Sequence, residues 1–321
     1  MAATTGIRAG ANTSDTRLAF VKETAWSETP DEPAFTNLRL TSENMQWAKE
    51  TVRSNEIRPD RNIVDEIQVS RSSAGNVDFE LSYGAFDDLI ESAMFSEWAT
   101  NKIKNGADAG HSFTVERRLA LPDASFEYHR FIGQVVNTMS LNVTAGQIVT
   151  GSFGLMGKFG GRDTAIIADA TYADAPQNEV INAANHFASL SVGAVAPVPL
   201  VRSVSLEITN NLRAQQAVGS LDAVGIGAGR FEATGSMECY FTSGDLITSF
   251  LNHETIALSF VLGTATAKKY KFTLPSIVLT GNPGANAGGN DQDVMLTLSF
   301  TAILDRLTST GCALQIERAV A

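Results

Sequence analysis

The chain has few of the residues that build crosslinked or membrane-spanning folds. Among 321 residues only two are cysteines, Cys239 and Cys312, which excludes a disulfide framework or a zinc site built from several cysteines. No apolar run approaches the ~20 residues that a membrane-spanning helix needs, so we expect no membrane partner. The segment from Met1 to Asn12 contains no apolar stretch of the kind found in signal peptides. We therefore expect synthesis and folding in a cytoplasm.

Residue patterns that support catalysis or cofactor binding are also missing. The sequence has no G-x-S-x-G elbow and no P-loop. Asp78 and Glu80 stand two apart, and paired carboxylates can perform acid–base chemistry, but no aromatic platform accompanies them. The histidines are scattered and none lies beside a nucleophile at motif spacing: His111, His129, His186 and His253. We predict no enzyme activity, no cofactor and no metal site.

The charge balance is acidic. The chain has 24 basic and 35 acidic residues, a net charge of −11, spread along the sequence without an acidic tail. Such a chain binds DNA phosphates poorly, because phosphate binding depends on lysine and arginine. The simplest interpretation of the charge is solubility.

A long internal repeat organises the sequence. The segment Gly75–Gly84 alternates apolar and polar residues in the same phase as Gly235–Gly244. Alternation of this kind is typical of a strand with one buried face. Each segment continues into a stretch with helical spacing of apolar residues, at 86–94 and 245–251.

Three further pairs of segments match in the same order along the chain. These pairs are 38–42 with 204–209, 128–136 with 270–278, and 149–155 with 296–302. The ordered matches indicate a duplication, and the many short strands indicate a sandwich or barrel in each copy. We therefore predict a mainly β fold with two tandem domains, each flanked by an α-helix. The predicted boundaries are an N-terminal extension 1–35, copy one 36–160, a linker 161–186, copy two 187–310 and a C-terminal tail 311–321.

Several of these segments resemble a known family. The charged stretch Ser54–Arg61, followed by Gly75–Tyr83 and Gly84–Leu89, is similar to the major tail tube proteins of long-tailed, non-contractile (siphovirus-type) bacteriophages. The N-terminal run Thr5–Asn12 also fits. The resemblance covers most of the chain and is strongest from about 36 to 95. The charged loop departs from the pattern in copy two, where Ala217–Gly229 is mostly Gly and Ala.

The resemblance implies a function and partners. Related proteins fold as a β-sandwich or barrel flanked by a helix, and they form rings of six domains that stack into a hollow tube through which genomic DNA passes. With two domains per chain, three chains would complete a pseudo-sixfold ring, and a six-chain ring with twelve domains is the alternative. The implied partners are the tape measure protein, the tail terminator and tail tip proteins. DNA would pass without specific binding, and the chain would be assembled in the bacterial host cytoplasm and reside in the virion tail.

Three sets of residues follow from this interpretation. One face of the repeated strands is apolar and should pack on the core: Val77, Phe79, Leu81, Met237, Cys239, Phe241, Leu296, Leu298 and Phe300. The opposite face is polar and should line the bore: Asp78, Glu80, Ser82, Ser236, Glu238, Thr242, Thr297 and Ser299. The charged loop of copy one is the candidate contact between stacked rings: Arg53, Glu56, Arg58, Asp60 and Arg61.

Two other functions stay open from the sequence. Another ring-forming tail component, such as a terminator or a baseplate hub, would have a similar fold and would form single rings. A β-sandwich carbohydrate-binding module would show exposed aromatic or acidic residues clustered around a cleft, and the three tryptophans, Trp26, Trp47 and Trp98, form no such cluster in the sequence.

Overall fold

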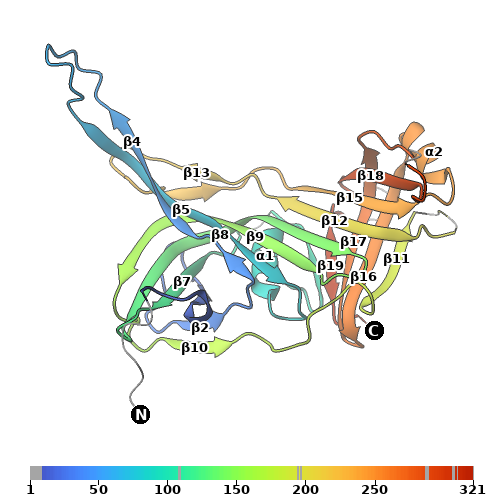
Figure 1. The fold of residues 1–321 in the computed structure, drawn as a ribbon, viewed down its shortest axis with the longest axis horizontal. Coiled ribbons are helices and arrows are strands. Elements are labelled where there is room, and N and C mark those ends of the chain that lie inside the picture. Colours follow the sequence, from blue (N-terminus) through green and yellow to red (C-terminus); the bar gives the residue numbers. More distant parts are fainter. Residues whose placement is uncertain are drawn as a thin grey trace.

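The structure is a computed structural model that describes residues 9–107, 110–193, 195, 197–285, 289–305, 308 and 310–320. The chain is mainly β, with long strands and short α-helices, which confirms the fold class predicted from the alternating segments (Figure 1). Nearly all strands belong to one 17-stranded sheet, and a separate two-stranded sheet joins β13 to β14.

The first half of the chain supplies the strands and the helix that precede residue 175. A short 3-10 turn, Thr13–Asp15, comes first. The elements that follow are β1 (Arg17–Lys22), β2 (Ala34–Asn37), β3 (Ser42–Glu43), β4 (Gln46–Arg53), β5 (Glu66–Glu80), α1 (Asp87–Met94), β6 (Lys102–Lys104), β7 (Phe113–Ala120), β8 (Phe126–Thr144), β9 (Thr150–Asp163) and β10 (Thr171–Asp174). Helix α1 carries two aspartates in its first turn, where they stabilise the helix dipole, and ends at Phe95 in the left-handed conformation.

The second half supplies the remaining elements. They are β11 (Phe187–Val192), β12 (Val201–Thr209), β13 (Arg213–Gln215), β14 (Gly225–Gly227), β15 (Glu232–Tyr240), α2 (Asp245–Leu251), β16 (Thr255–Ala265), β17 (Lys268–Thr280), β18 (Met295–Ala302) and β19 (Gln315–Arg318). Helix α2 follows β15 as α1 follows β5, and each helix is followed by a hairpin, β16–β17 or β7–β8.

The two halves share one strand topology. Paired neighbours in the first half run β4, β5, β9, β8, β7 and β1. Paired neighbours in the second half run β12, β15, β18, β17, β16 and β11, which is the same order of equivalent strands. A shared order across six strands and a helix is what a duplicated domain produces.

The pairing registers differ slightly from the match drawn on the sequence. Val77 lies opposite Phe153, whereas the equivalent Met237 lies opposite Leu298, two residues before Phe300. A slip of two residues leaves every side chain on the same face of its strand, because side chains alternate with period two. The segments matched on the sequence are therefore offset by two residues in the structure, and the faces assigned from the match are unaffected by this offset.

The two halves are joined closely. Strand β12 of the second half pairs with the end of β8 in the first half, and β19 pairs with both β17 and β6. One hydrophobic cluster runs through both halves, from Leu18 to Ile316. The predicted extension and tail thus contain sheet strands, β1 and β19, and the predicted linker contributes β10, which pairs with β2.

A buried tyrosine connects the halves. The hydroxyl of Tyr270 in β17 donates a hydrogen bond to the Asp87 carboxylate at the start of α1, and it accepts one from the Gly84 backbone N–H at 2.8 Å. Arg318 of β19 donates to the same Asp87 side chain. Burial raises the pKa of Tyr270 well above its usual value, so the hydroxyl stays protonated and continues to donate.

Replacing this tyrosine tests the connection. We expect Tyr270→Phe to lower the free energy of unfolding by about 1–2 kcal/mol, because the ring still fills its site while two hydrogen bonds are lost. Urea unfolding followed by tryptophan fluorescence measures the change. Tyr240→Phe is the matched control, because Tyr240 is 41% exposed, and it should leave the unfolding midpoint unaltered.

An ion cluster on β8 and β9 predicts a pH effect. Hydrogen bonds from Arg162 and His129 lower the pKa of the Glu127 carboxyl from 4.5 to about 2. A lowered folded-state pKa gives stability that is present above pH 4.5 and is lost as the pH falls towards 2. We therefore expect the wild-type chain to lose more stability than Glu127→Gln between pH 5 and pH 2, as measured by thermal unfolding. Equal losses in the two chains would contradict this assignment.

Candidate functional site

A polar face extends across both halves of the joined sheet. In consecutive strands β5, β9, β8, β12 and β15, the residues Asp78, Ser152, Ser140, Glu207 and Thr234 lie opposite one another in register. The residues between them along each strand, such as those of the buried core, point to the other side. The row therefore crosses from the first half into the second without a break in the sheet.

A second row on the same face consists of small polar side chains. It runs through Asn142, Ser205, Ser236, Ser299 and Thr280, in strands β8, β12, β15, β18 and β17. The hydroxyls of Ser205 and Ser236 lie 2.9 Å apart and share a hydrogen bond. Short side chains of this kind keep the face flat and hydrated.

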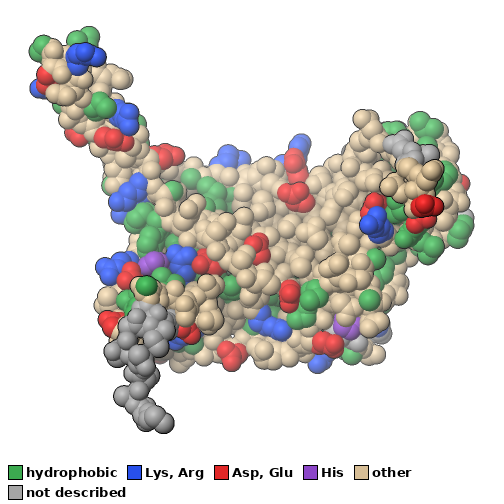
Figure 2. All heavy atoms as spheres, in the orientation of Figure 1, with side chains coloured by type: hydrophobic (Ala, Val, Ile, Leu, Met, Phe, Trp, Pro, Cys, Tyr) green, Lys and Arg blue, Asp and Glu red, His purple; other side chains and the backbone are tan. Residues whose placement is uncertain are grey.

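The charge on this face is entirely negative. We call this face of the sheet the polar wall. It is made by the outward side chains of strand segments that contain no Lys or Arg: 76–80, 138–144, 150–156, 203–209, 232–240 and 295–301. Its outward carboxylates are Asp78, Glu80, Glu207, Glu232 and Glu238. Two basic side chains from outside these segments contact the wall: the Arg230 guanidinium donates to Glu232 at 3.0 Å, and the Arg202 guanidinium lies 3.7 Å from Glu238. In Figure 2 the middle of the near face is mostly tan, with scattered red and a few green and blue side chains.

Most of the residues predicted to line a bore lie on the polar wall. Thr297 and Ser299 are exposed, and a second group is half-buried: Asp78, Glu80, Ser236 and Glu238. The prediction for Ser82 is wrong, because β5 ends at Glu80 and a bridge to Val180 buries Ser82 completely. Thr242 lies beyond the end of β15, so it belongs to a connection and not to the wall. Phe241, predicted as core, is 41% exposed for the same reason.

Sequence reasoning missed part of the wall. Glu207, Ser140 and Ser205 lie on it, in strands that were not assigned to this face. The signal was available, because residues 139–144 and 203–209 alternate apolar and polar as strictly as the segments that were used. The pairing of β8 with β12 across the two halves could not be predicted from this alternation.

The charged loop of copy one lies at the tip of a long hairpin. Strands β4 and β5 project far from the body of the molecule, and the loop connects them at the outer end (Figure 1). Arg58 pairs with Asp60 at 3.1 Å and lowers the pKa of that carboxyl, and Arg53 lies 3.6 Å from Glu66. The hairpin from Gln46 to Ala74, here called the arm, also exposes apolar side chains: Val52, Ile57, Ile63, Val64, Ile67 and Val69.

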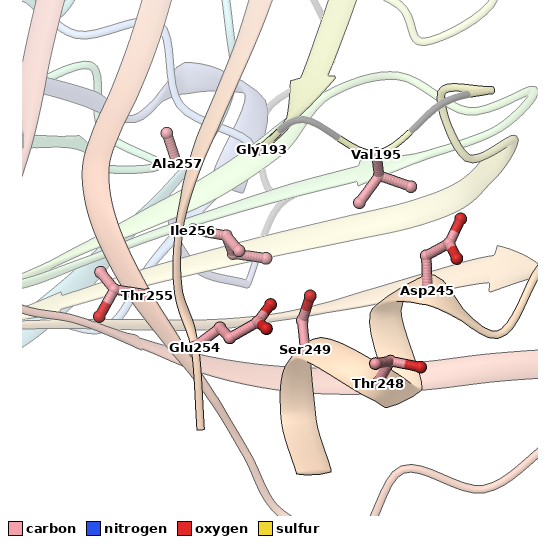
Figure 3. A pocket seen from close by; sticks show the side chains of 9 residues that line it. All are labelled: Gly193, Val195, Asp245, Thr248, Ser249, Glu254, Thr255, Ile256 and Ala257. Carbon is pink, nitrogen blue, oxygen red and sulfur yellow. The ribbon is translucent and has the colours of Figure 1, made fainter. Parts of the chain in front are cut away.

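A cavity of ≈ 580 Å³ lies beside α2 (Figure 3). Its lining includes the carboxylates of Asp245 and Glu254 with the hydroxyls of Thr248 and Ser249, and the Glu254 and Ser249 side chains point towards one another. Hydrogen bonds from Asn252 and Ser249 lower the pKa of Glu254, which leaves that group ionised and unsuited to donate a proton. We assign no chemistry to this cavity.

The described residues contain neither a metal-binding cluster nor a membrane-spanning helix. Over the described ranges, no group of three or more His, Cys, Asp or Glu side chains is arranged to hold a metal ion. None of the helices in those ranges has the length and apolar character needed to cross a bilayer.

Comparison with known proteins identifies the family of the chain. No curated protein matches the chain. The family model of the phage tail tube protein, in contrast, matches residues 13–302, which span both halves and the wall strands. The chain therefore belongs to the phage tail tube protein family.

Proposed function

We propose that this tail tube protein forms closed rings that stack into a hollow tube, and that the polar wall faces the bore through which genomic DNA passes. One observation carries the proposal: β12 pairs with β8, so that one sheet with a uniformly polar, base-free face already spans two domains. The finer assignment to a siphovirus-type, non-contractile tail rests on the resemblance of the charged loop and the repeated strands.

The join between β8 and β12 is the template for the join between chains. Asn44 and Ser205 occupy equivalent positions, because the side-chain oxygen of each accepts a hydrogen bond from the backbone N–H of the paired strand, at Asn76 and Ser236. Residues 42–48 therefore correspond to β12, and we expect them to pair with the next chain as β12 pairs with β8. Their partner would be the segment 281–285, which follows β17 and forms an isolated bridge from Ala285 to Leu296.

The edge that would pair between chains is covered by side chains in the single chain. The Met45 backbone N–H donates to the Glu43 carboxylate at 2.9 Å, and the Met45 carbonyl accepts from Arg117 at 3.2 Å. Leu206, at the equivalent position, instead lies opposite Leu141 of β8. A side-chain cap of this kind protects an open edge against unwanted pairing until a correct partner arrives.

The duplication sets the number of chains. We take residues 36–160 and 187–310 as the two tube domains, and three chains would then place six domains around the axis. The alternative of six chains and twelve domains would need a wider ring with smaller angles between neighbours. The β8–β12 join fixes one of these angles within the chain, and a ring closes when the join between chains repeats it.

The polar wall suits the passage of DNA. A duplex slides past a surface that offers carboxylates and hydroxyls because no lysine or arginine holds its phosphates by counterion release. The net charge of −11 then has a role beyond solubility. The protein would act in the virion tail after assembly in the host cytoplasm, with the tape measure, terminator and tail tip proteins as partners, and the charged loop would contact a neighbouring ring.

Electron microscopy of the purified protein tests this function. Long hollow filaments would support a tube protein. Single rings that do not elongate would favour a terminator or a baseplate hub instead. A protein that stays monomeric under all assembly conditions and binds an oligosaccharide would favour the carbohydrate-binding alternative.

A further inference from the structure

The two halves carry equivalent hairpins in different positions. Gln46 pairs with Ala74 at the base of the arm, and Glu207 pairs with Thr234 at the base of the second hairpin. The chain lengths between these pairs are nearly equal. The arm projects away from the body, whereas the distal part of the second hairpin, which contains β13 and β14, lies along the first half (Figure 1).

The second hairpin is held on the first half by specific contacts. Asp222 near its tip accepts two hydrogen bonds from the Arg71 guanidinium on β5, at 2.6 and 2.7 Å. Nearer its base, the Asn210 amide donates to the carbonyls of Ala93 and Val136, both at 3.0 Å. Leu212 packs with Phe95 and Val135 in a small separate cluster. This hairpin is therefore docked on the first half both near its base and near its tip.

The outer part of the arm, residues 50–66, has no such support. In the described part of the chain, the hydrogen bonds and ion pairs formed by side chains of residues 50–66 all end within the arm, as in the Thr51–Glu66 bond. Its apolar side chains stand in solvent, with Ile57 96% and Ile63 63% exposed. Exposed apolar side chains gathered on one projecting element indicate a contact with another molecule.

The surface that the second hairpin covers on the first half has an equivalent on the second half, and that equivalent surface is open. Arg71 and Phe231 occupy equivalent positions before Gly75 and Gly235, and the paired registers make Phe159 equivalent to Leu304. In the first half, Arg71 stacks on Phe159 and binds Asp222. In the second half, Phe231, Ile303 and Leu304 line an open cavity of ≈ 610 Å³, and Leu304 is 56% exposed.

The chemistry of each hairpin matches its own site. The charged site of the first half, Arg71, receives the charged tip residue Asp222. Asn62 corresponds to Asp222, because each stands the same number of positions before its glycine, Gly75 or Gly235. Ile63 and Val64 come directly after Asn62. The open site of the second half is apolar at Phe231 and Leu304. At the position of the arm that corresponds to Asp222, the exposed side chains of Ile63 and Val64 are apolar as well.

We propose that the arm docks on a second copy of this chain within the same ring, with Ile63 and Val64 in the cavity lined by Phe231, Ile303 and Leu304. The proposal rests on the ring arrangement given above. It reproduces between chains the contact that β13 and β14 make within the chain. The second hairpin extends from the second half over the first half, and the arm then extends from the first half over the second half of the next chain.

A disulfide between chains tests the docking. The double variant Ile63→Cys/Leu304→Cys is assembled under reducing conditions, oxidised and examined on a non-reducing gel. The native cysteines do not interfere, because Cys239 is 1% and Cys312 0% exposed. A bond within one chain is not expected, because Ile63 belongs to the loop at the outer end of the arm, which projects away from the body that contains β18 (Figure 1). The matched control is Val218→Cys/Leu304→Cys, which moves the first cysteine to the tip of the docked hairpin.

The outcomes separate the docking from the tube itself. We expect a covalent ladder that stops at three chains, or at six if the ring has six, and no ladder from the control. A ladder that continues without limit would show that the arm joins successive rings, which overturns docking within a ring. Normal tubes without crosslinking would overturn the docking while the tube function stands. A variant and wild type that both fail to assemble would overturn both proposals.

Discussion

Virions whose tail tube carries Asp78→Lys, Glu80→Lys and Glu238→Lys should assemble normally and eject DNA at least about tenfold more slowly than wild type. The three residues lie on the outward face of β5 and β15, where they are half-buried and make no contribution to the apolar core. Lysines at these positions would turn a face without basic residues into one that neutralises phosphates, and the DNA would be held by counterion release. The delay should shrink as the salt concentration rises.

A matched variant separates the wall from the overall charge. Asp31→Lys, Glu32→Lys and Asp123→Lys make the same change in net charge at exposed positions in the β1–β2 and β7–β8 connections. Ejection from these virions should match wild type in a DNA-release assay with fluorescent dye. Normal ejection from the wall variant would remove the assignment of the polar wall to the bore.

Shortening the arm should abolish tube formation and leave a folded, soluble chain. The change replaces residues 54–65 with an Asn-Gly turn between Arg53 and Glu66, a sequence that favours tight hairpins. Since the removed residues are mostly exposed and bond only within the arm, the free energy of unfolding should change by less than about 1 kcal/mol. Sedimentation and electron microscopy measure the loss of assembly, and circular dichroism confirms the fold.

A milder change in the same loop distinguishes its two expected roles. Arg58→Gln with Asp60→Asn removes the charged pair at the tip and keeps the apolar side chains of the arm. If the charged loop joins stacked rings, this variant should give single rings that do not elongate. Full-length tubes from the shortened arm would contradict both the stacking role and the docking role.

The sequence predicted the faces of the strands better than their partners. Alternation in Gly75–Tyr83 and Gly235–Ser243 identified the buried and polar faces, because side-chain direction is a local property with period two. The pairing of β8 with β12 was not predictable, because it joins residues far apart in the chain and depends on the relative placement of two domains. Glu207 was missed on the wall for that reason.

The ends of strands and of the chain were also beyond sequence reasoning. Ser82 continues the alternation, but the chain leaves the strand at Glu80 and the bridge to Val180 covers it. The segment after residue 310 was predicted to be a tail, yet Ile316 is fully buried in β19 between β17 and β6. Short strands of this kind are stabilised by tertiary pairing, which leaves little local signal.

The most direct test of this account is a class-averaged electron micrograph of the assembled protein viewed along its axis, combined with the mass of one ring. We expect a hollow ring of six lobes that are alternately unequal, with the mass of three chains and with the strands that carry Asp78 and Glu238 nearest the centre. A solid particle, or a ring in which those strands face outwards, would contradict the claim that the joined sheet encloses the bore.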